Sequence, residues 1–270
     1  MYKEYLPCDL LSPYIDRYWE YEGQPKYETR ISIPPYGCTD FVFTLGEGVH
    51  DINNALEMQP YHSYFVGPMN THTELVTLSN HVHVFGIRFL PGGLYRLMGL
   101  PLNELVNHKC HASDLTNLFE GSFIERLYEG WMHNAVAEVV DQFLVVQLKK
   151  YDPKTDEKIL FAVDQINQCK GVLSMRALAS TVCLCQRHLE RKFKIYTGYS
   201  PKEYGQIIRF WNAIDLLRKM PNDNLLSTAV AAGYYDVPHL SREVKRLSGN
   251  TPSAFLMLPS SITTRIYLES

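Results

Sequence analysis

The sequence predicts an α+β protein in which a strand-rich N-terminal half, ending in helices, precedes an all-helical C-terminal half. Three observations support this prediction: a pattern repeated 51 residues apart near the C-terminus, short β-rich runs within the first 90 residues, and opposite charge in the two halves. Residues 1–150 hold 10 Lys/Arg and 18 Asp/Glu, whereas residues 151–270 hold 16 and 11. We therefore expect two domains, 1–150 and 151–270, each long enough to bury its own core.

The first 150 residues show strand signals before helix signals. Runs rich in β-branched and aromatic residues, broken by Pro, Gly and Asn, predict strands at 30–33, 39–45, 63–67, 73–78 and 81–90. An opening segment at 13–21 fits either a helix or a strand. Helical segments are expected after the strands, at 92–98, 102–106, 121–129 and 132–149. The polar, Pro-containing stretch 149–155 is the expected linker.

The C-terminal half contains one pattern twice. Six positions keep the same offset, five with the identical residue: Leu189/Leu240, Arg191/Arg242, Phe193/Val244, Lys194/Lys245, Gly198/Gly249 and Pro201/Pro252. Each copy reads as two short helices joined by a tight turn, 175–182 with 185–196 and 225–232 with 237–248. Asp236 is a good N-cap for the last of these helices. An apolar stripe along 201–220 predicts a buried, rigid helix that fixes the two units relative to each other.

Helix–turn–helix units place their second helix, the recognition helix, in the major groove of DNA. The polar residues off the apolar face of the predicted recognition helices suit that role: Gln186, Arg187, Glu190, Arg191 and Lys194 in the first, and His239, Arg242, Lys245 and Arg246 in the second. Arg and Gln bond base edges at two positions, while Lys meets phosphate as a point charge. Taken one at a time, each of these arginines is better interpreted as a solvated surface charge. The duplication favours DNA, because two units on one helix can read major-groove faces one turn apart, roughly 34 Å.

Residues 155–258 resemble the DNA-binding domain of AraC/XylS-family transcription regulators. The matching motifs are Leu178-Ala179, Leu189-x-Arg191-x-Phe193-Lys194, Gly198-Tyr199-Ser200-Pro201-x-x-Tyr204, Arg209, Ala213, Leu216-Leu217, Gly233-Tyr234, Leu240-Ser241-Arg242 and Gly249-Asn250-Thr251-Pro252. The resemblance implies seven helices, two helix–turn–helix units, sequence-specific binding to double-stranded promoter DNA, and RNA polymerase as a partner. By position it implies these base-reading candidates: Arg187, Glu190 and Arg191 in the first unit, and Val237, Pro238, His239, Ser241 and Arg242 in the second.

The chain departs from the family pattern at several positions. Cys183 stands where a Gly is usual in the first turn, and Cys185 stands where Ser usually caps the recognition helix. Val237 and Pro238 give the second recognition helix little polar surface. We therefore expect the first unit to read bases and the second chiefly to bind the DNA backbone. A redox sensor is an alternative role for the two cysteines, because a helix dipole lowers the pKa of a thiol at its N-terminus.

The N-terminal half resembles an uncharacterised domain attached to many such regulators. The matching residues are Pro7, Leu11, Trp19, Ile33-Pro34, Asp40-Phe41, Val66-Gly67-Pro68, Leu105 and, above all, Gly86-x-Arg88-Phe89-x-Pro91-Gly92-Gly93. The resemblance implies a small β-barrel-like domain that senses a small-molecule effector or mediates dimerisation. The helices at 121–149 either pack on their own barrel or form homodimer contacts. Effector-binding candidates are Tyr36, Phe43, Tyr64 and Arg88, although aromatic residues build a filled barrel core equally well.

Two histidines in the N-terminal half suggest an alternative, a metal site. His81 and His83 alternate along a strand, with Glu74 available as a carboxylate, as in a metal-binding barrel. However, the two histidines share their face with Phe85, Ile87 and Phe89, so we expect core or surface histidines, no metal and no cofactor. We expect no enzyme. The alternative is an enzyme-like, ligand- or metal-binding N-terminal domain that uses the helix–turn–helix half only for targeting.

Three features of the sequence bear on the cellular compartment of the protein. No apolar run approaches the 18 residues of a membrane span, and residues 1–4 do not have the pattern of a signal peptide. Six cysteines without repeated spacing are typical of reduced thiols. We expect a cytoplasmic bacterial protein with no membrane contact.

Overall fold

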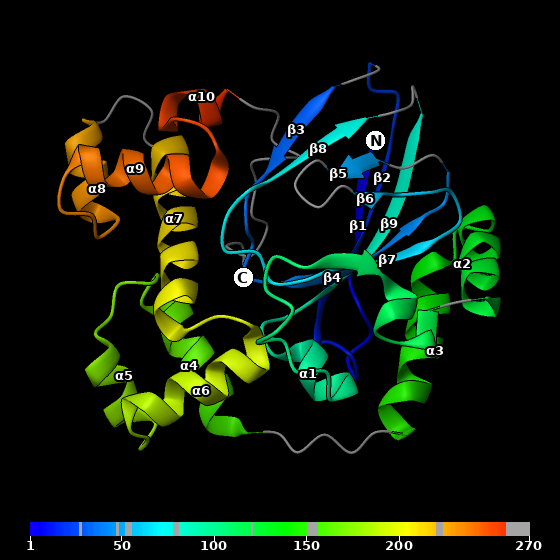
Figure 1. Cartoon of the computed structure of the whole chain (residues 1–270), viewed down its shortest axis with the longest axis horizontal. Helices are drawn as coiled ribbons and strands as arrows, with labels where there is room; N and C mark the ends of the chain where they lie inside the picture. Colours follow the sequence, from blue (N-terminus) through cyan, green and yellow to red (C-terminus); the bar gives the residue numbers. More distant parts are fainter. Residues whose placement is uncertain are drawn as a thin grey trace.

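The computed structural model describes residues 1–26, 29–46, 49–51, 56–77, 81–119, 121–150, 156–219 and 224–257. Within these residues, two antiparallel sheets and helices α1 to α3 form the N-terminal half, and helices α4 to α10 form the C-terminal half beside it (Figure 1). The expected α+β architecture is confirmed. The boundary placed between residues 150 and 151 and most of the predicted linker fall on residues 151–155, outside the described residues.

The described strands form two sheets in which every pairing is antiparallel. The larger sheet has the order β1 (Tyr2–Tyr5), β2 (Ile15–Gly23), β9 (Val82–Phe89), β4 (Thr39–Thr44), β7 (Ser63–Val66) and β10 (Lys109–His111). The smaller has the order β3 (Arg30–Ile33), β8 (Thr73–Thr77), β5 (Val49–Asp51) and β6 (Leu56–Glu57). All five predicted strands form, and the ambiguous opening segment becomes β2. Sequence reasoning missed β1, β5, β6 and β10, which have at most four residues each.

The larger sheet has two different faces because side chains alternate along its strands. One face buries a row of aromatic and aliphatic residues against α1 (Gly93–Met98), α2 (Ser122–Met132) and α3 (Val136–Lys150): Phe41, Phe43, Phe65, Phe85, Ile87 and Phe89. The other face carries Asp40, Tyr64 and Arg88, among others. The segment 102–106, expected to be helical, forms turns instead. Its Leu102 N–H donates to the Ile195 carbonyl in the C-terminal half.

Seven helices make up the described C-terminal half: α4 (Glu157–Gln168), α5 (Met175–Thr181), α6 (Gln186–Thr197), α7 (Pro201–Lys219), α8 (Leu225–Ala231), α9 (Val237–Ser248) and α10 (Pro252–Leu256). The helix–turn–helix units are α5 with α6 and α8 with α9, and the predicted connecting helix is α7. Met220, expected as its last residue, lies outside the described residues. The expectation of seven helices with two such units is confirmed.

The structural repeat extends further than the sequence repeat. Gly198 and Gly249 end α6 and α9 with φ of 80° and 73°, and each donates its N–H to the carbonyl of Lys194 or Lys245. Just before them, the Thr197 and Ser248 hydroxyls each donate, at 2.8 Å, to the carbonyl four residues earlier. Because Thr and Ser share this hydroxyl, two different residue types end the two recognition helices in the same way.

The turn of the first unit contains a strained residue. Cys183, the residue after the C-cap of α5, has a φ of +52°, whereas Gly233, the residue after the C-cap of α8, has a φ of +81°. A left-handed conformation costs a non-glycine residue roughly 1–2 kcal/mol, partly offset by the greater freedom of glycine in the unfolded chain. Cys183→Gly should therefore raise the free energy of unfolding in urea by about 0.5–1 kcal/mol. Cys183→Ala is the control, because it removes the thiol but keeps the Cβ; equal stabilisation by both changes would contradict the argument.

Candidate nucleic-acid interface

The first recognition helix, α6, presents one continuous polar stripe. Its apolar face is buried through Leu189 and Phe193, four residues apart. The side chains of all five predicted DNA-contacting residues are exposed: Gln186, Arg187, Glu190, Arg191 and Lys194. Lys192 lies on another side of the helix, where its Nζ is 2.5 Å from Asp156 Oδ2 at the start of α4. The structure thus brings these five residues together on a single accessible face.

The second recognition helix, α9, has fewer side chains available for contact with DNA than α6. Arg242 and Lys245 are exposed, and the predicted contacts His239 and Ser241 are half-buried. Arg246 is exposed but already engaged: its Nη1 donates to the Asn70 carbonyl of the N-terminal half at 3.0 Å. Arg242 Nε donates to the Pro238 carbonyl of its own helix at 3.2 Å. Fewer cationic groups therefore point away from the protein here than the sequence pattern indicates.

The N-termini of the two recognition helices are capped differently. Asp236 accepts a hydrogen bond from the His239 N–H at 2.7 Å and caps α9, as predicted. Cys185, at the same place before α6, makes no side-chain capping bond. The helices that precede them are capped by Ser174 and Asn224. The N-terminus of α6 therefore has the weaker capping expected from Cys185.

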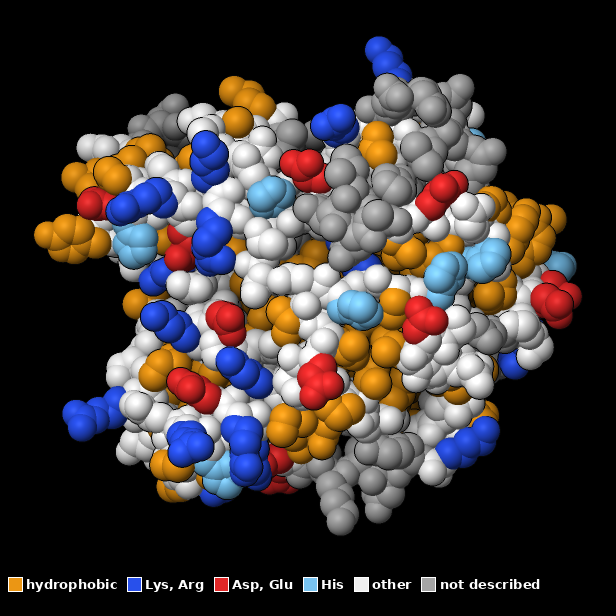
Figure 2. Space-filling model, in the orientation of Figure 1, with side chains coloured by type: hydrophobic (Ala, Val, Ile, Leu, Met, Phe, Trp, Pro, Cys, Tyr) orange, Lys and Arg blue, Asp and Glu red, His pale blue; other side chains and the backbone are white. Residues whose placement is uncertain are grey.

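Positive charge gathers over the helical half of the molecule. Figure 2 shows Lys and Arg side chains spread over the left part of the molecule, where Figure 1 places α4 to α10. Because a duplex carries two phosphates in every base pair, such a surface favours contact with nucleic acid. Glu190 adds a carboxylate to the α6 stripe, and a carboxylate accepts a hydrogen bond from the amino group of cytosine.

The two halves meet through contacts that sequence reasoning missed. Tyr36, after β3, stacks on Trp211 of α7 with ring centroids 5.1 Å apart. Trp211 Nε1 also donates to the Pro35 carbonyl at 2.9 Å. Tyr95 of α1 packs on Tyr196 of α6 at 4.2 Å. The only available sequence signal was the aromatic character of these residues, because each pair is separated by about a hundred positions or more.

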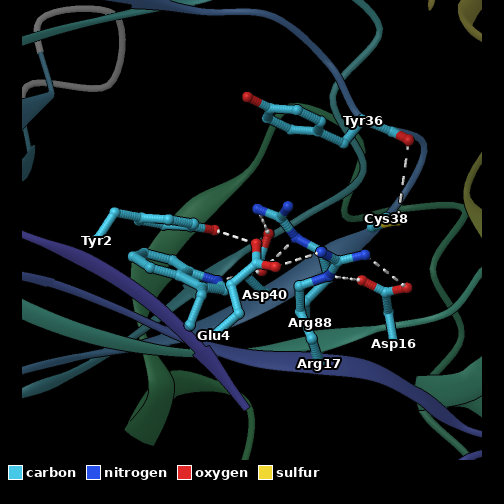
Figure 3. Close-up of polar contacts among 9 residues, drawn as sticks. Tyr2, Glu4, Asp16, Arg17, Tyr36, Cys38, Asp40 and Arg88 are labelled. Carbon is cyan, nitrogen blue, oxygen red and sulfur yellow. Dashed lines mark hydrogen bonds and ion pairs between the residues drawn. The ribbon is translucent and has the colours of Figure 1, made fainter. Parts of the chain in front are cut away.

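A charged cluster lies on the second face of the larger sheet and consists of Glu4, Asp16, Arg17, Asp40 and Arg88 (Figure 3). Arg17 Nη1 is 2.7 Å from Glu4 Oε2, and the Arg17 guanidinium also contacts Asp16. Arg88 Nε is 2.9 Å from Asp40 Oδ1, and the same oxygen accepts from Trp19 Nε1 at 2.9 Å. The Arg88 guanidinium lies 4.6 Å from the centre of the Tyr36 ring. The cluster is therefore linked, through Tyr36, to Trp211 of α7.

The four effector-binding candidates do not converge on one point. Arg88 belongs to the charged cluster, and the Tyr36 ring lies against its guanidinium. Tyr64 belongs to the same face of the sheet, where its hydroxyl accepts from the Gln59 N–H at 2.6 Å. Phe43 lies on the opposite face, completely buried against Phe119 and other rings. The sequence could not separate these faces for residues on different strands.

The histidines considered as metal ligands lie apart from Glu74. His83 is buried on the helix-covered face, with Nε2 2.9 Å from Glu20 Oε1, and exposed His81 is 3.5 Å from Glu22. Burial acts to raise the pKa of Glu20, but hydrogen bonds from His83 and Tyr5 outweigh it and lower the pKa. Glu74 belongs to β8 in the other sheet. Across the described ranges, no group of three or more His, Cys, Asp or Glu side chains has an arrangement suited to a metal ion.

Two family models match the chain. A model described as a helix-turn-helix domain matches residues 178–257, and a model described as a domain of unknown function (DUF6597) matches residues 3–111. The comparison with curated proteins gave no match. Among the described helices, none combines the length and apolar character needed to cross a bilayer.

Similar solved structures include ToxT from Vibrio cholerae. A 1.65 Å structure of ToxT is 14% identical, covers 88% of this chain and 97% of that chain, and has a TM-score of 0.53. An apo variant of ToxT is 14% identical, covers 92% and 98%, and has a TM-score of 0.50. A Chromobacterium violaceum transcriptional regulator, described as AraC-type, is 28% identical over 38% of this chain and 95% of that chain, with a TM-score of 0.35. The chain thus has the fold of ToxT, with a helix-turn-helix domain in its C-terminal region and a match to a domain of unknown function in its N-terminal region.

Proposed function

We propose that this protein is a sequence-specific DNA-binding transcription regulator. The observation that carries the proposal is the α6 stripe: five exposed polar residues, including Arg187 and Arg191, on the recognition helix of one of two units fixed to the same helix. Arginine side chains of this kind make paired hydrogen bonds to guanine in the major groove. The family resemblance extends the proposal to double-stranded promoter DNA, RNA polymerase and a bacterial cytoplasm. On this proposal the chain is a regulator and not an enzyme.

The two units contribute differently to binding in this proposal. The α6 stripe reads base edges through Arg187, Glu190 and Arg191. The α9 surface binds mainly phosphate through Arg242 and Lys245, because Arg246 is held by the N-terminal half. Positively charged contacts to phosphate position the protein without reading sequence. The first unit therefore supplies most of the specificity.

Arg191→Ala should weaken binding to the preferred site by about 1–3 kcal/mol and flatten the preference at one base pair. The preferred site is first selected from a pool of random duplexes with the full chain, and binding to it and to random DNA is then measured at one salt concentration. Lys192→Ala is the matched control on the same helix, since its side chain is bonded to Asp156. An equal loss of affinity for selected and for random DNA would show that Arg191 contacts only phosphate.

The N-terminal half is proposed to sense a small molecule or to hold a second copy of the chain. Sensing is supported by the charged cluster, because it reaches α7 through Arg88, Tyr36 and Trp211. Dimerisation through α2 and α3 is the second form of the proposal, and Val146 of α3 is 49% exposed, which leaves apolar surface for such a contact. Thermal unfolding of the full chain with metabolites and metals separates the two, because a ligand that binds only the folded state raises the midpoint. Turnover of one of these compounds in a separate activity assay would instead favour the enzyme-like alternative.

A further inference from the structure

Both recognition helices end against the same loop of the N-terminal half. This β7–β8 loop, residues 67–72, meets the end of α6 where Gly198 packs on Pro68, so closely that a Cβ on Gly198 would overlap the Pro68 ring. The neighbouring Tyr199 hydroxyl donates to the Met69 carbonyl at 3.0 Å. The loop therefore packs on the C-cap of the first recognition helix and accepts a buried hydrogen bond from the residue that follows it.

The same loop is bonded to the end of α9. Arg246 donates to the Asn70 carbonyl at 3.0 Å, and the Arg246 carbonyl accepts in return from Thr71 Oγ1 at 3.1 Å. His72 Nδ1 lies 3.3 Å from that carbonyl. On the adjacent strand β3, Ser32 Oγ donates to the Ser248 carbonyl at 2.8 Å. Carbonyls of the last helical turn have no partner within the helix, so Thr71 bonds a carbonyl that the helix leaves unpaired. The Ser248 carbonyl accepts from Asn250 Nδ2 at 2.9 Å as well as from Ser32.

The loop is itself held in place by the segment before β10. The Asn107 N–H donates to the Pro68 carbonyl at 2.7 Å, and Gly67 donates its N–H to His108 at 2.9 Å. The side chains of Asn70 and Asn107 complete the connection: Asn107 Oδ1 accepts from the Asn70 N–H at 2.9 Å, and Asn107 Nδ2 donates to Asn70 Oδ1 at 2.8 Å. Because these hydrogen bonds hold the loop in one conformation, it can restrain the position of α9 relative to α6.

We propose that the β7–β8 loop is a positioning element that fixes the separation and rotation of the two recognition helices. This inference rests on the proposed DNA-binding function. The helix α7 already joins the two units, and its 19 residues span about 28 Å. The loop supplies a second connection that joins the far ends of α6 and α9 directly. The full chain therefore reads two half-sites at one preferred spacing.

Spacing on DNA is a sensitive measure of such a constraint. One base pair moves a half-site by roughly 3.4 Å and rotates it by about 35°, since a helical turn takes about 34–36 Å and 10–10.5 base pairs. With the loop in place, the second unit cannot follow that movement and loses its contacts. Without it, α9 is held by its packing on α7 alone, and its end can shift toward the displaced half-site.

The test compares the unchanged protein with the triple variant Ser32→Ala/Thr71→Ala/His72→Ala, which removes three side-chain contacts to the end of α9. The matched control is Ser12→Ala/His62→Ala/Thr116→Ala, the same residue types, whose hydrogen bonds are to Asp9, Pro60 and Leu118 in the N-terminal half. Each protein is titrated with its selected site and with sites that have one or two base pairs inserted or removed between the half-sites. We expect the unchanged and control proteins to lose about tenfold or more in affinity per inserted pair, and the triple variant to lose less than about threefold.

Two results would overturn the proposal. One is an identical dependence on spacing in the triple variant, and the other is an equal change of affinity at every spacing, which would mean that the contacts only stabilise the fold or shield the DNA surface. Failure of the unchanged protein to select any DNA would instead refute the proposed function. Thermal unfolding shows whether the triple variant is folded. If it is not folded, the single variant Thr71→Ala takes its place in the test.

Discussion

Replacing Trp211 with Ala should lower the free energy of unfolding of the full chain by about 3–5 kcal/mol, the usual cost of removing a fully buried tryptophan. The Trp211 side chain is completely buried in α7. Its ring packs on Phe210 at 5.1 Å and on Phe255 of α10 at 6.2 Å, and stacks on Tyr36 of the N-terminal half at 5.1 Å. The substitution therefore opens a cavity in the C-terminal core and removes a contact between the halves.

Equilibrium unfolding in urea measures this loss, and Trp211→Phe is the control. Phenylalanine keeps an aromatic ring in the stack but leaves the Pro35 carbonyl without its donor, which costs about 1–3 kcal/mol. A double-mutant cycle with Tyr36→Ala isolates the contact between the halves, expected at about 0.5–1.5 kcal/mol. A loss below 1 kcal/mol for Trp211→Ala would contradict the close packing of this side chain between Phe210, Phe255 and Tyr36.

Arg209→Ala should destabilise the chain by about 3–5 kcal/mol, because it leaves a buried carboxylate without its cation. Arg209 of α7 donates to Glu243 of α9, with Nη2 2.9 Å from Oε1 and 3.0 Å from Oε2. The Glu243 side chain is only 6% exposed and also accepts from the Tyr234 hydroxyl at 2.9 Å. Burial acts to lower the pKa of Arg209, but the attraction of Glu243 outweighs it and raises that pKa above its ordinary value.

The companion substitutions separate charge from geometry. Arg209→Lys keeps the positive charge but loses the bidentate hydrogen bonds of the guanidinium. Its free energy of unfolding should therefore lie between those of the unchanged protein and Arg209→Ala. Arg209→Met with Glu243→Leu removes both charges and should cost much less than Arg209→Ala, because no charge is left buried. If the double variant is as unstable as Arg209→Ala, packing and not the buried charge determines the loss. Urea unfolding again provides the measurement, and circular dichroism shows whether the helices persist.

The elements that sequence reasoning predicted well are those determined by neighbouring residues. The spacing of Leu189 and Phe193 orients α6, so the exposure of Arg187 and Arg191 followed from the sequence alone. The cap at Asp236 was likewise predictable, because capping needs only a short polar side chain next to the first helical turn. The strands at 39–45 and 81–90 followed from their composition.

Other features were decided only by tertiary structure. Both Phe43 and Tyr64 looked like lining for a binding site, but the register between β4 and β7 places them on opposite faces of the sheet. Short strands such as β1 and β10 become strands only by pairing with a neighbour, so their few residues carry no strong signal. Arg246 has the sequence pattern of a DNA contact, yet the folded N-terminal half already engages its guanidinium.

By itself, the sequence determined the α+β class, the two helix–turn–helix units and the polar face of each recognition helix, because side-chain periodicity and capping act within a few residues. Only the tertiary structure decided how the N-terminal half holds those helices. The contacts of Thr71 and Ser32 are made to backbone carbonyls of α9, more than 170 positions away. Every residue has a carbonyl, so nothing in the sequence of α9 marks the two that are used. Which carbonyls meet the β7–β8 loop depends on how the sheets and α7 pack together.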